Sequence, residues 1–278
     1  MIATLLAPPA SEADGRRRFR LEIPAGSPLF AGHFPGEPIL PGIAHPALVA
    51  EALTAAGETL PEIAEIVSLK LRRPVRPGDR LDLLADGPTT DGTVRFEIRL
   101  SSQDQEGATV SLGALRTATA RSGEGLRPAI APEAAPGFPP VATLLPHQPP
   151  ARLVRSIRAV TAESFAGLAE IPAASPFVHQ GRAPAYLGIE AAAQGAAVLE
   201  ALARCASPRP HRPRIGYLVG IRNGRCRGAW LPAGVPFPIA VELTGSAPPL
   251  SIYTLRVAAE DGGELVAGTI QTYLAASP

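Results

Sequence analysis

Cysteine is almost missing from this sequence of 278 residues, which contains only Cys205 and Cys226. Two cysteines without a paired motif can form neither a disulfide framework nor a cysteine-based metal site. No cofactor and no metal are therefore expected, and the cytoplasm, a reducing compartment, is the expected location.

A surplus of charge of one sign is also missing, because 26 Lys and Arg residues are balanced by 25 Asp and Glu residues. This balance gives no support to a nucleic-acid partner, which would normally require a basic surplus. No apolar run approaches the length of a membrane span, so no membrane partner is expected. Residues 1–14 have no basic region ahead of their short apolar piece, and this is not typical of a signal peptide.

Proline, in contrast, is abundant, with 32 residues, and it is concentrated with glycine around one histidine. Residues 31–42 place three prolines and three glycines around His33. Such a run specifies a tight loop, because proline fixes φ and glycine permits backbone conformations that other residues avoid. A helical run follows over 46–54. His33 is therefore a candidate proton-transfer group, and the alternative is a histidine that caps a turn.

The order of the predicted elements indicates two domains of the α+β class. A strand over 16–23 and the helix over 46–54 precede strands over 63–75, 79–85, 93–102 and 109–119. The segment that follows lacks periodicity and is predicted to be a linker. The second half repeats the pattern, with strands over 152–160 and 164–171, a helix over 184–203, and strands over 216–222, 238–244, 250–258 and 264–274. The expected division is a domain over 1–121, a linker over 122–140 and a domain over 141–278.

The His33 loop, Gly32-His-Phe-Pro-Gly-x-Pro-x-x-Pro-Gly42, resembles the active-site motif of FabZ- and FabA-type 3-hydroxyacyl-[acyl carrier protein] dehydratases. The resemblance implies a hotdog fold, a long helix wrapped by a curved antiparallel sheet. It also implies a catalytic pair, this histidine and an acid fourteen residues later. In this sequence the fourteenth position is Ala47, so the first half lacks the acid.

The second half carries the complementary features. Its opening, Leu144-Leu-Pro-His-Gln-Pro-Pro150, resembles the Leu-Pro-His-x-x-Pro opening of FabZ-type dehydratases, and Gly188-Ile-Glu-Ala-Ala-Ala-Gln194 resembles the acid-bearing segment. Aligning Pro41 with Pro184 places Glu190 opposite Ala47 and Pro176 opposite His33. The first half is similar to ApeI-type and the second to ApeP-type dehydratases of aryl-polyene clusters.

In this family two hotdogs pair, and each active site takes its histidine from one and its acid from the other. The resemblance therefore implies a double hotdog, a pseudo-dimer in one chain, with one composite site made by His33 and Glu190. His33 is expected to act as base. Glu190, kept protonated by burial on an alanine-rich helix, is expected to act as acid.

Further site residues follow from the same resemblance. Phe34 and Gly36 are expected to contact the substrate as part of the motif. The backbone N–H of Ala185 or Tyr186, at the start of the second helix, is an expected oxyanion donor. Gln194, one turn after Glu190, is expected to orient the carboxyl group.

Other titratable residues have less specific interpretations. Glu51 lies one turn beyond the missing acid, and His179 lies three positions after Pro176, so each could substitute for a lost group. His147 is interpreted as structural and His45 as a polar cap. Arg72, Arg73 and Arg76 are a candidate contact for an acidic carrier protein, and the alternative is a solvated strand end.

The resemblance implies dehydration of 3-hydroxyacyl groups on acyl carrier protein, in fatty-acid-like or polyene biosynthesis. The implied partners are the carrier protein, through its phosphopantetheine-linked acyl chain, and a ketosynthase or other synthase component. Two alternatives stay open. One is an (R)-specific enoyl-CoA hydratase or a thioesterase of the same fold, and the other is a non-catalytic acyl-binding or assembly subunit.

Overall fold

The computed structural model describes residues 2–58, 62–101, 107–117, 127–129, 137–205 and 215–275. Most of the linker predicted over 122–140 lies outside these ranges. Among the described helices, none is long and apolar enough to cross a membrane.

Among its described residues, the first half contains one long helix and seven strands. The helix is α1 (Ala44–Ala55), and a short 3-10 helix, η1 (Pro28–Phe30), precedes it. The strands are β1 (Thr4–Leu5), β2 (Ala10–Ser11), β3 (Arg17–Glu22), β4 (Ile63–Leu71), β5 (Arg80–Ala85), β6 (Thr93–Leu100) and β7 (Thr109–Thr117). Pro46 lies in the first turn of α1, where a backbone N–H is not needed for helical hydrogen bonds.

The second half repeats this plan around the longer helix α2 (Leu187–Cys205). Its other elements are η2 (Val141–Thr143), β8 (Val154–Val160), β9 (Ser164–Ala169), β10 (Arg182–Pro184), β11 (Gly216–Cys226), β12 (Trp230–Pro232), β13 (Phe237–Ala247), β14 (Leu250–Ala258) and β15 (Glu264–Leu274). The helix begins three residues later than predicted, because Arg182–Pro184 pairs with Trp230–Pro232 as a two-stranded sheet.

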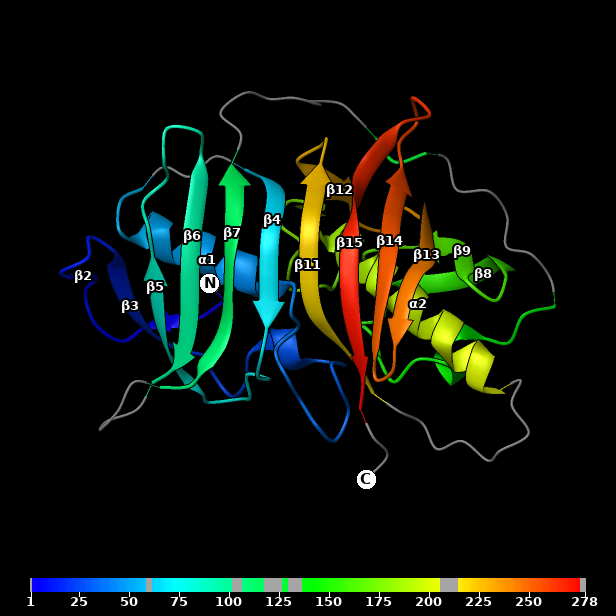
Figure 1. The fold of residues 1–278 in the computed structure, drawn as a ribbon, viewed down its shortest axis with the longest axis horizontal. Helices are drawn as coiled ribbons and strands as arrows, with labels where there is room; N and C mark the ends of the chain where they lie inside the picture. The colour runs from blue at the N-terminus through cyan, green and yellow to red at the C-terminus, as the bar shows by residue number, and fades with distance from the viewer. Residues whose placement is uncertain are drawn as a thin grey trace.

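All described strands except β10 and β12 form one continuous antiparallel sheet in the order β1-β3-β5-β6-β7-β4-β11-β15-β14-β13-β9-β8, and β2 pairs with β3. The two halves join where β4 pairs with β11, with Leu69 opposite Ile221. Figure 1 shows this sheet in front and both helices behind it. Each half is a helix wrapped by its own part of the sheet, and the expected double hotdog is confirmed.

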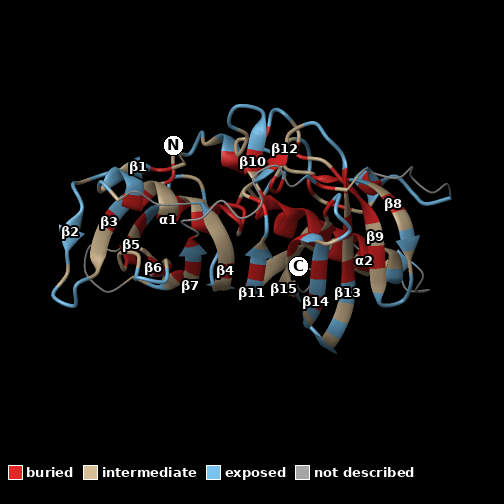
Figure 2. Ribbon diagram, turned by 90° about the horizontal axis from the view of Figure 1, so that it is seen from above, coloured by how far each residue is buried: buried red, intermediate tan, exposed pale blue. Residues whose placement is uncertain are grey.

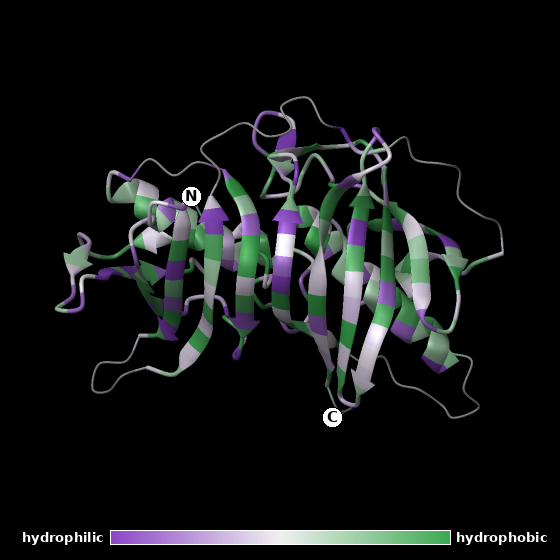
Figure 3. Cartoon of the chain, turned by 45° about the horizontal axis from the view of Figure 1, so that its top comes forward, coloured by the Kyte–Doolittle hydropathy of each residue, from purple (hydrophilic) through white to green (hydrophobic). Residues whose placement is uncertain are grey.

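The alternation of apolar and polar residues explains how the sheet covers the helices. Phe19 and Leu21 of β3 are buried, whereas Arg20 between them is exposed. The strands in Figure 3 show the same alternation of hydrophobic and hydrophilic residues. Helix α2 is buried along most of its length (Figure 2), and this suits its run of alanines, which lets the sheet approach closely. At Gly195, a Cβ atom would lie 2.9 Å from the ring of Phe165.

Candidate active site

The His33 loop has a fixed conformation because its backbone hydrogen bonds close on one another. The N–H of Ile39 donates to the carbonyl of His33 at 2.9 Å, and the N–H of Glu37 donates to the carbonyl of Phe34 at 3.2 Å. Gly36, in the turn between them, has a φ of 81°, which favours glycine. The predicted tight loop is confirmed, and it presents the His33 ring in one orientation.

One hydrogen bond defines the tautomer of His33. Its Nδ1 lies 3.0 Å from the carbonyl oxygen of Ile39, and a carbonyl can only accept, so Nδ1 carries the hydrogen. The Nε2 atom is therefore left with its lone pair. Burial lowers the pKa of His33 below its ordinary value, and the nearby Glu190 opposes this shift. A neutral imidazole with a free Nε2 is suited to accept a proton.

Glu190 projects from the first turn of α2 and is held by Gln194. The Gln194 Nε2 donates to Glu190 Oε1 at 3.1 Å and to the carbonyl of Ala151 at 2.9 Å. The Gln194 Oε1 accepts from the N–H of Leu153 at 2.8 Å. Glu190 and Gln194 are 7% and 1% exposed, so the second half holds this carboxyl group from within its core.

His147, interpreted from the sequence as structural, lines the cavity beside His33 and Glu190. Its Nε2 lies 4.0 Å from Glu190 Oε1, and its ring contacts Phe34 edge-on with centroids 4.7 Å apart. Ring or carboxylate atoms of His33, His147 and Glu190 all lie within 4.8 Å of one another. Burial first, and then the charges of His33 and Arg152, keep the pKa of His147 well below its ordinary value. The Leu-Pro-His opening was the only sequence signal for this residue.

Backbone contact between the halves brings these groups together. The N–H of Gln148 donates to the carbonyl of Gly32 at 3.0 Å. Gly32 has a φ of 77°, and a Cβ atom there would overlap the carbonyl oxygen of Gln148. Glycine is therefore required at position 32 for the segment that carries His147 to approach the loop that carries His33.

The three groups face a cavity of about 520 Å³ between the halves. Phe34, Leu71 and Val75 of the first half and Ala193, Ala197 and Leu218 of the second form its apolar walls. Its lining also includes Arg72, Arg73 and Arg76, which we call the basic mouth because all three are exposed. A predominantly apolar cavity with a few convergent polar groups is typical of a small-molecule site.

Several predicted site residues do not reach this cavity. The N–H of Ala185 already donates to the carbonyl of Ala229 at 2.9 Å. Neither Ala185 nor Tyr186 is among the described residues that line the cavity, so the structure does not support them as oxyanion donors. Gly36 shapes the loop without lining the cavity. Phe34 and Gln194 do line it, as expected for residues that contact a substrate or orient the carboxyl group.

Glu51 and His179, the two possible substitutes for lost groups, also lie outside this cavity. Glu51 Oε2 accepts a hydrogen bond from the N–H of Ile2 at 2.6 Å and is not part of the cavity lining. His179 is exposed, and its backbone pairs with Arg182 in a hairpin.

His45 lines the cavity, and its Nδ1 forms a hydrogen bond with the Ser111 hydroxyl at 2.8 Å. Burial lowers the pKa of His45 to about 4, well below its ordinary value. The unfolded chain therefore binds this proton at a higher pH than the folded chain does. The contribution of His45 to the free energy of unfolding is complete at a pH above its pKa in the unfolded chain. It is lost as the pH falls toward its pKa in the folded chain. We expect the free energy of unfolding to fall by roughly 2–3 kcal/mol between about pH 7 and about pH 4.5 from this residue.

Urea unfolding at the two pH values measures this effect. His45→Gln should remove about that amount of the pH dependence, while the buried His33 and His147 retain their own share. An unchanged pH dependence in His45→Gln would show that His45 does not contribute.

Comparisons with known proteins agree with this architecture. Residues 139–277 match the ApeP-like family, described as ApeP dehydratase, and residues 10–112 match the ApeI-like family, described as ApeI dehydratase. The 3-hydroxyacyl-[acyl-carrier-protein] dehydratase FabZ of Mannheimia succiniciproducens is 40% identical over 76 residues, which cover 23% of this chain and 48% of that protein. The chain spans about half the length of the curated relatives it matches.

Solved structures extend the likeness of fold over the whole chain. The dehydratase domain of the polyketide PpsC from Mycobacterium tuberculosis has a TM-score of 0.67 at 15% identity, with 97% of each chain covered. A fusion DH domain has a TM-score of 0.58 at 17% identity, with 100% of this chain and 94% of that chain covered. The chain belongs to the ApeP-like dehydratases through its second half, and an ApeI-like dehydratase segment precedes it.

Proposed function

We propose that this protein removes water from 3-hydroxyacyl thioesters at one composite site formed by His33 and Glu190. The observation that carries the proposal is that a neutral imidazole from one half and a carboxyl group from the other face the same cavity, within 4.8 Å. The ApeI-like and ApeP-like families, both described as dehydratases, support the same reaction class.

The reaction breaks two bonds of the substrate and needs one proton to be taken and one to be given. His33 Nε2 accepts the proton from C2, because His33 lines the cavity and its Nδ1 is already bonded to the Ile39 carbonyl. Glu190 donates a proton to the hydroxyl group on C3, which leaves as water while the C2–C3 double bond forms. Gln194 holds the Glu190 carboxyl group in place during this transfer. The reaction leaves His33 as an imidazolium and Glu190 as a carboxylate, and transfer of one proton from His33 to Glu190 restores both groups.

The alignment of the halves implies that the opposite composite site is inactive. Ala47 occupies the position of the acid and Pro176 that of the histidine, and neither side chain can transfer a proton. Of the two possible substitutes, Glu51 accepts a hydrogen bond from the N–H of Ile2, and His179 is exposed. We therefore expect one active site per chain.

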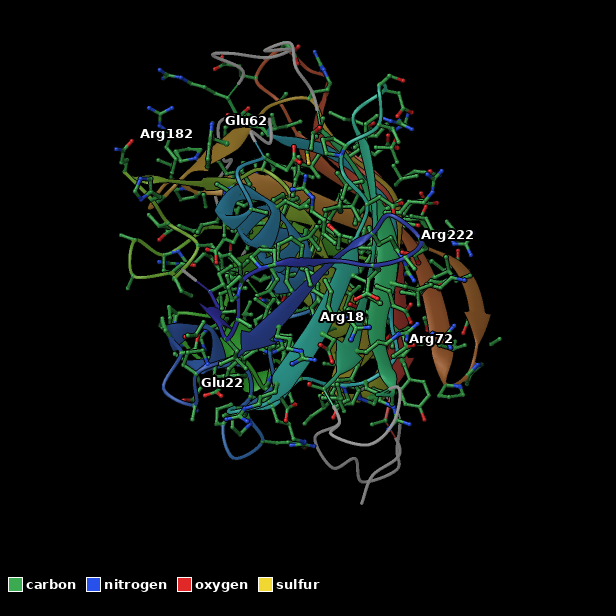
Figure 4. All side chains as sticks on the ribbon, turned by 90° about the vertical axis from the view of Figure 1, so that its left-hand side faces the viewer. Arg18, Glu22, Glu62, Arg72, Arg182 and Arg222 are labelled. Atoms are coloured by element: carbon green, nitrogen blue, oxygen red, sulfur yellow. The ribbon has the colours of Figure 1, made fainter. Side chains whose placement is uncertain are left out.

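The carrier is proposed to be acyl carrier protein docked at the basic mouth. Arg72 and Arg73 are exposed at the cavity entrance, where an acidic partner would be attracted. Figure 4 shows Arg72 and Arg222 on the side of the outer sheet face and Arg182 on the opposite side. Arg76 is partly neutralised by Glu37, whose Oε1 lies 3.0 Å away. A ketosynthase or other synthase component, and the cytoplasmic location, stay predictions from the sequence.

We expect Arg72→Ser/Arg73→Ser to raise KM for an acyl-carrier-protein substrate roughly 10-fold at low salt, because the mouth loses two positive charges. The KM for the matching pantetheine thioester, which lacks the acidic protein, should stay unchanged. Arg182→Ser is the matched control, since it removes an exposed arginine from the opposite side. An equal rise for both substrates would contradict carrier docking at this mouth.

Mass spectrometry of the purified protein with 3-hydroxyacyl-carrier protein tests the function directly, through the loss of one water. The same acyl group on CoA distinguishes a carrier-protein enzyme from a CoA hydratase, and release of free acid would indicate a thioesterase. Acyl binding without turnover on either carrier would support the non-catalytic subunit instead.

A further inference from the structure

Three clustered titratable groups that line the cavity form a donor set that catalysis by one base and one acid does not require. His33, His147 and Glu190 offer two imidazole nitrogens and a carboxylate oxygen within 4.8 Å of one another, and all three residues are buried. Two histidines and one carboxylate are a frequent ligand set for zinc, with the fourth position left open.

His33 and Glu190 are each held in an orientation that suits coordination of a cation. The Nδ1–H of His33 is directed at the Ile39 carbonyl, so its Nε2 lone pair is available. Coordinating imidazoles usually donate their other nitrogen to a carbonyl or carboxylate, as His33 does here. The Gln194 amide supports Glu190 in the same way.

The site has the freedom to contract around an ion. Zinc ligands lie about 2.0–2.2 Å from the metal, so the three side chains must approach one another from their present spacing. His147 can move, because among the described residues its buried Nδ1 has no hydrogen-bond partner. Its Nε2 is 4.0 Å from Glu190 Oε1, which leaves a short distance to close. The cavity provides the path of entry from solvent.

The geometry points to a binding site for a zinc-type divalent cation formed by His33, His147 and Glu190. Nitrogen-rich ligand sets favour zinc and related transition metals over magnesium. The bound cation takes the lone pair of His33 and the oxygen of Glu190, so cation and 3-hydroxyacyl substrate exclude each other. Cation binding at this site is therefore a reversible inhibition. It differs from the proposed reaction because the ligand is a cation and because His147 takes part.

Calorimetric titration of the chelator-treated, full-length protein with Zn²⁺ tests the site without reference to activity. We expect one Zn²⁺ per chain, a raised unfolding temperature on binding and no comparable binding of Mg²⁺. Co²⁺ should give the visible absorption bands of a low-coordinate site. His147→Gln and Glu190→Gln should each weaken Zn²⁺ binding more than the roughly 10–100-fold that loss of an outer-shell partner costs. His179→Gln, an exposed histidine, is the control and should bind normally.

Absence of Zn²⁺ binding, or equal affinity in wild type, His147→Gln and Glu190→Gln, would overturn the proposal. Unfolding curves establish whether each variant is folded. If either His147→Gln or Glu190→Gln does not fold, the Zn²⁺ affinity of the other variant tests the proposal. If the protein shows no dehydratase activity, the titration still decides the cation site. If it is active, Zn²⁺ should inhibit competitively and a chelator should restore the rate.

Discussion

His33→Ala and Glu190→Gln will each lower kcat for water loss by about 10²–10⁴-fold, the usual contribution of a positioned acid or base. His33→Ala removes the Nε2 that accepts the C2 proton. Glu190→Gln retains the shape of the side chain but cannot give a proton to the leaving hydroxyl group. Following the enoyl product by mass spectrometry or absorbance measures both.

The two residues should also act as a unit. We expect the double variant to be little slower than the slower single variant, because removal of either group already disables the proton transfers. Glu51→Gln serves as the matched acid control, since Glu51 contacts the N–H of Ile2 and does not line the cavity, and its kcat should match wild type. If Glu190→Gln turned over at the wild-type rate, the acid would have to be another residue.

Gly32→Ala will disturb both stability and catalysis, because the new Cβ overlaps the Gln148 carbonyl. The backbone at position 32 has a positive φ, and a side chain there is also forced against the neighbouring segment. Together these effects should lower the free energy of unfolding by about 2–5 kcal/mol. The clash also separates His33 from the second half, and a displacement of about 1 Å can cost roughly 100-fold in rate.

Gly36→Ala separates the two causes. Gly36 has a similar φ of 81°, but a Cβ atom there would meet nothing within 4 Å. This variant should therefore show the conformational cost of about 1–2 kcal/mol without the clash. Urea unfolding of both variants gives the comparison. Equal destabilisation would mean that contact between position 32 and Gln148 contributes nothing.

The sequence allowed the fold and most of the helices and strands to be predicted. The proline and glycine spacing around His33 defines a loop locally, and the alternation along the strands requires no long-range information. The repeat placed His33 and Glu190 in complementary halves. The structure brings these two residues to one cavity, and their catalytic roles stay a proposal.

The remaining features depend on contacts between distant segments. His147 lies far from both His33 and Glu190 in sequence, and no local pattern shows that its ring lies beside the His33 ring and the Glu190 carboxyl group. The N–H of Ala185 donates to the carbonyl of Ala229, the residue just before β12, and helix periodicity does not reveal this partner. The short pair β10 and β12 was missed for the same reason, and it delays the start of α2.

The pairing of β4 with β11 has a consequence for how the protein behaves on dilution. In a dimer of separate chains, a site built from both partners disappears when the subunits dissociate. Here the two contributors are covalently joined, so each remains at high local concentration near the other. Specific activity should therefore be independent of protein concentration, and the ratio of base to acid is fixed at one by synthesis of a single polypeptide.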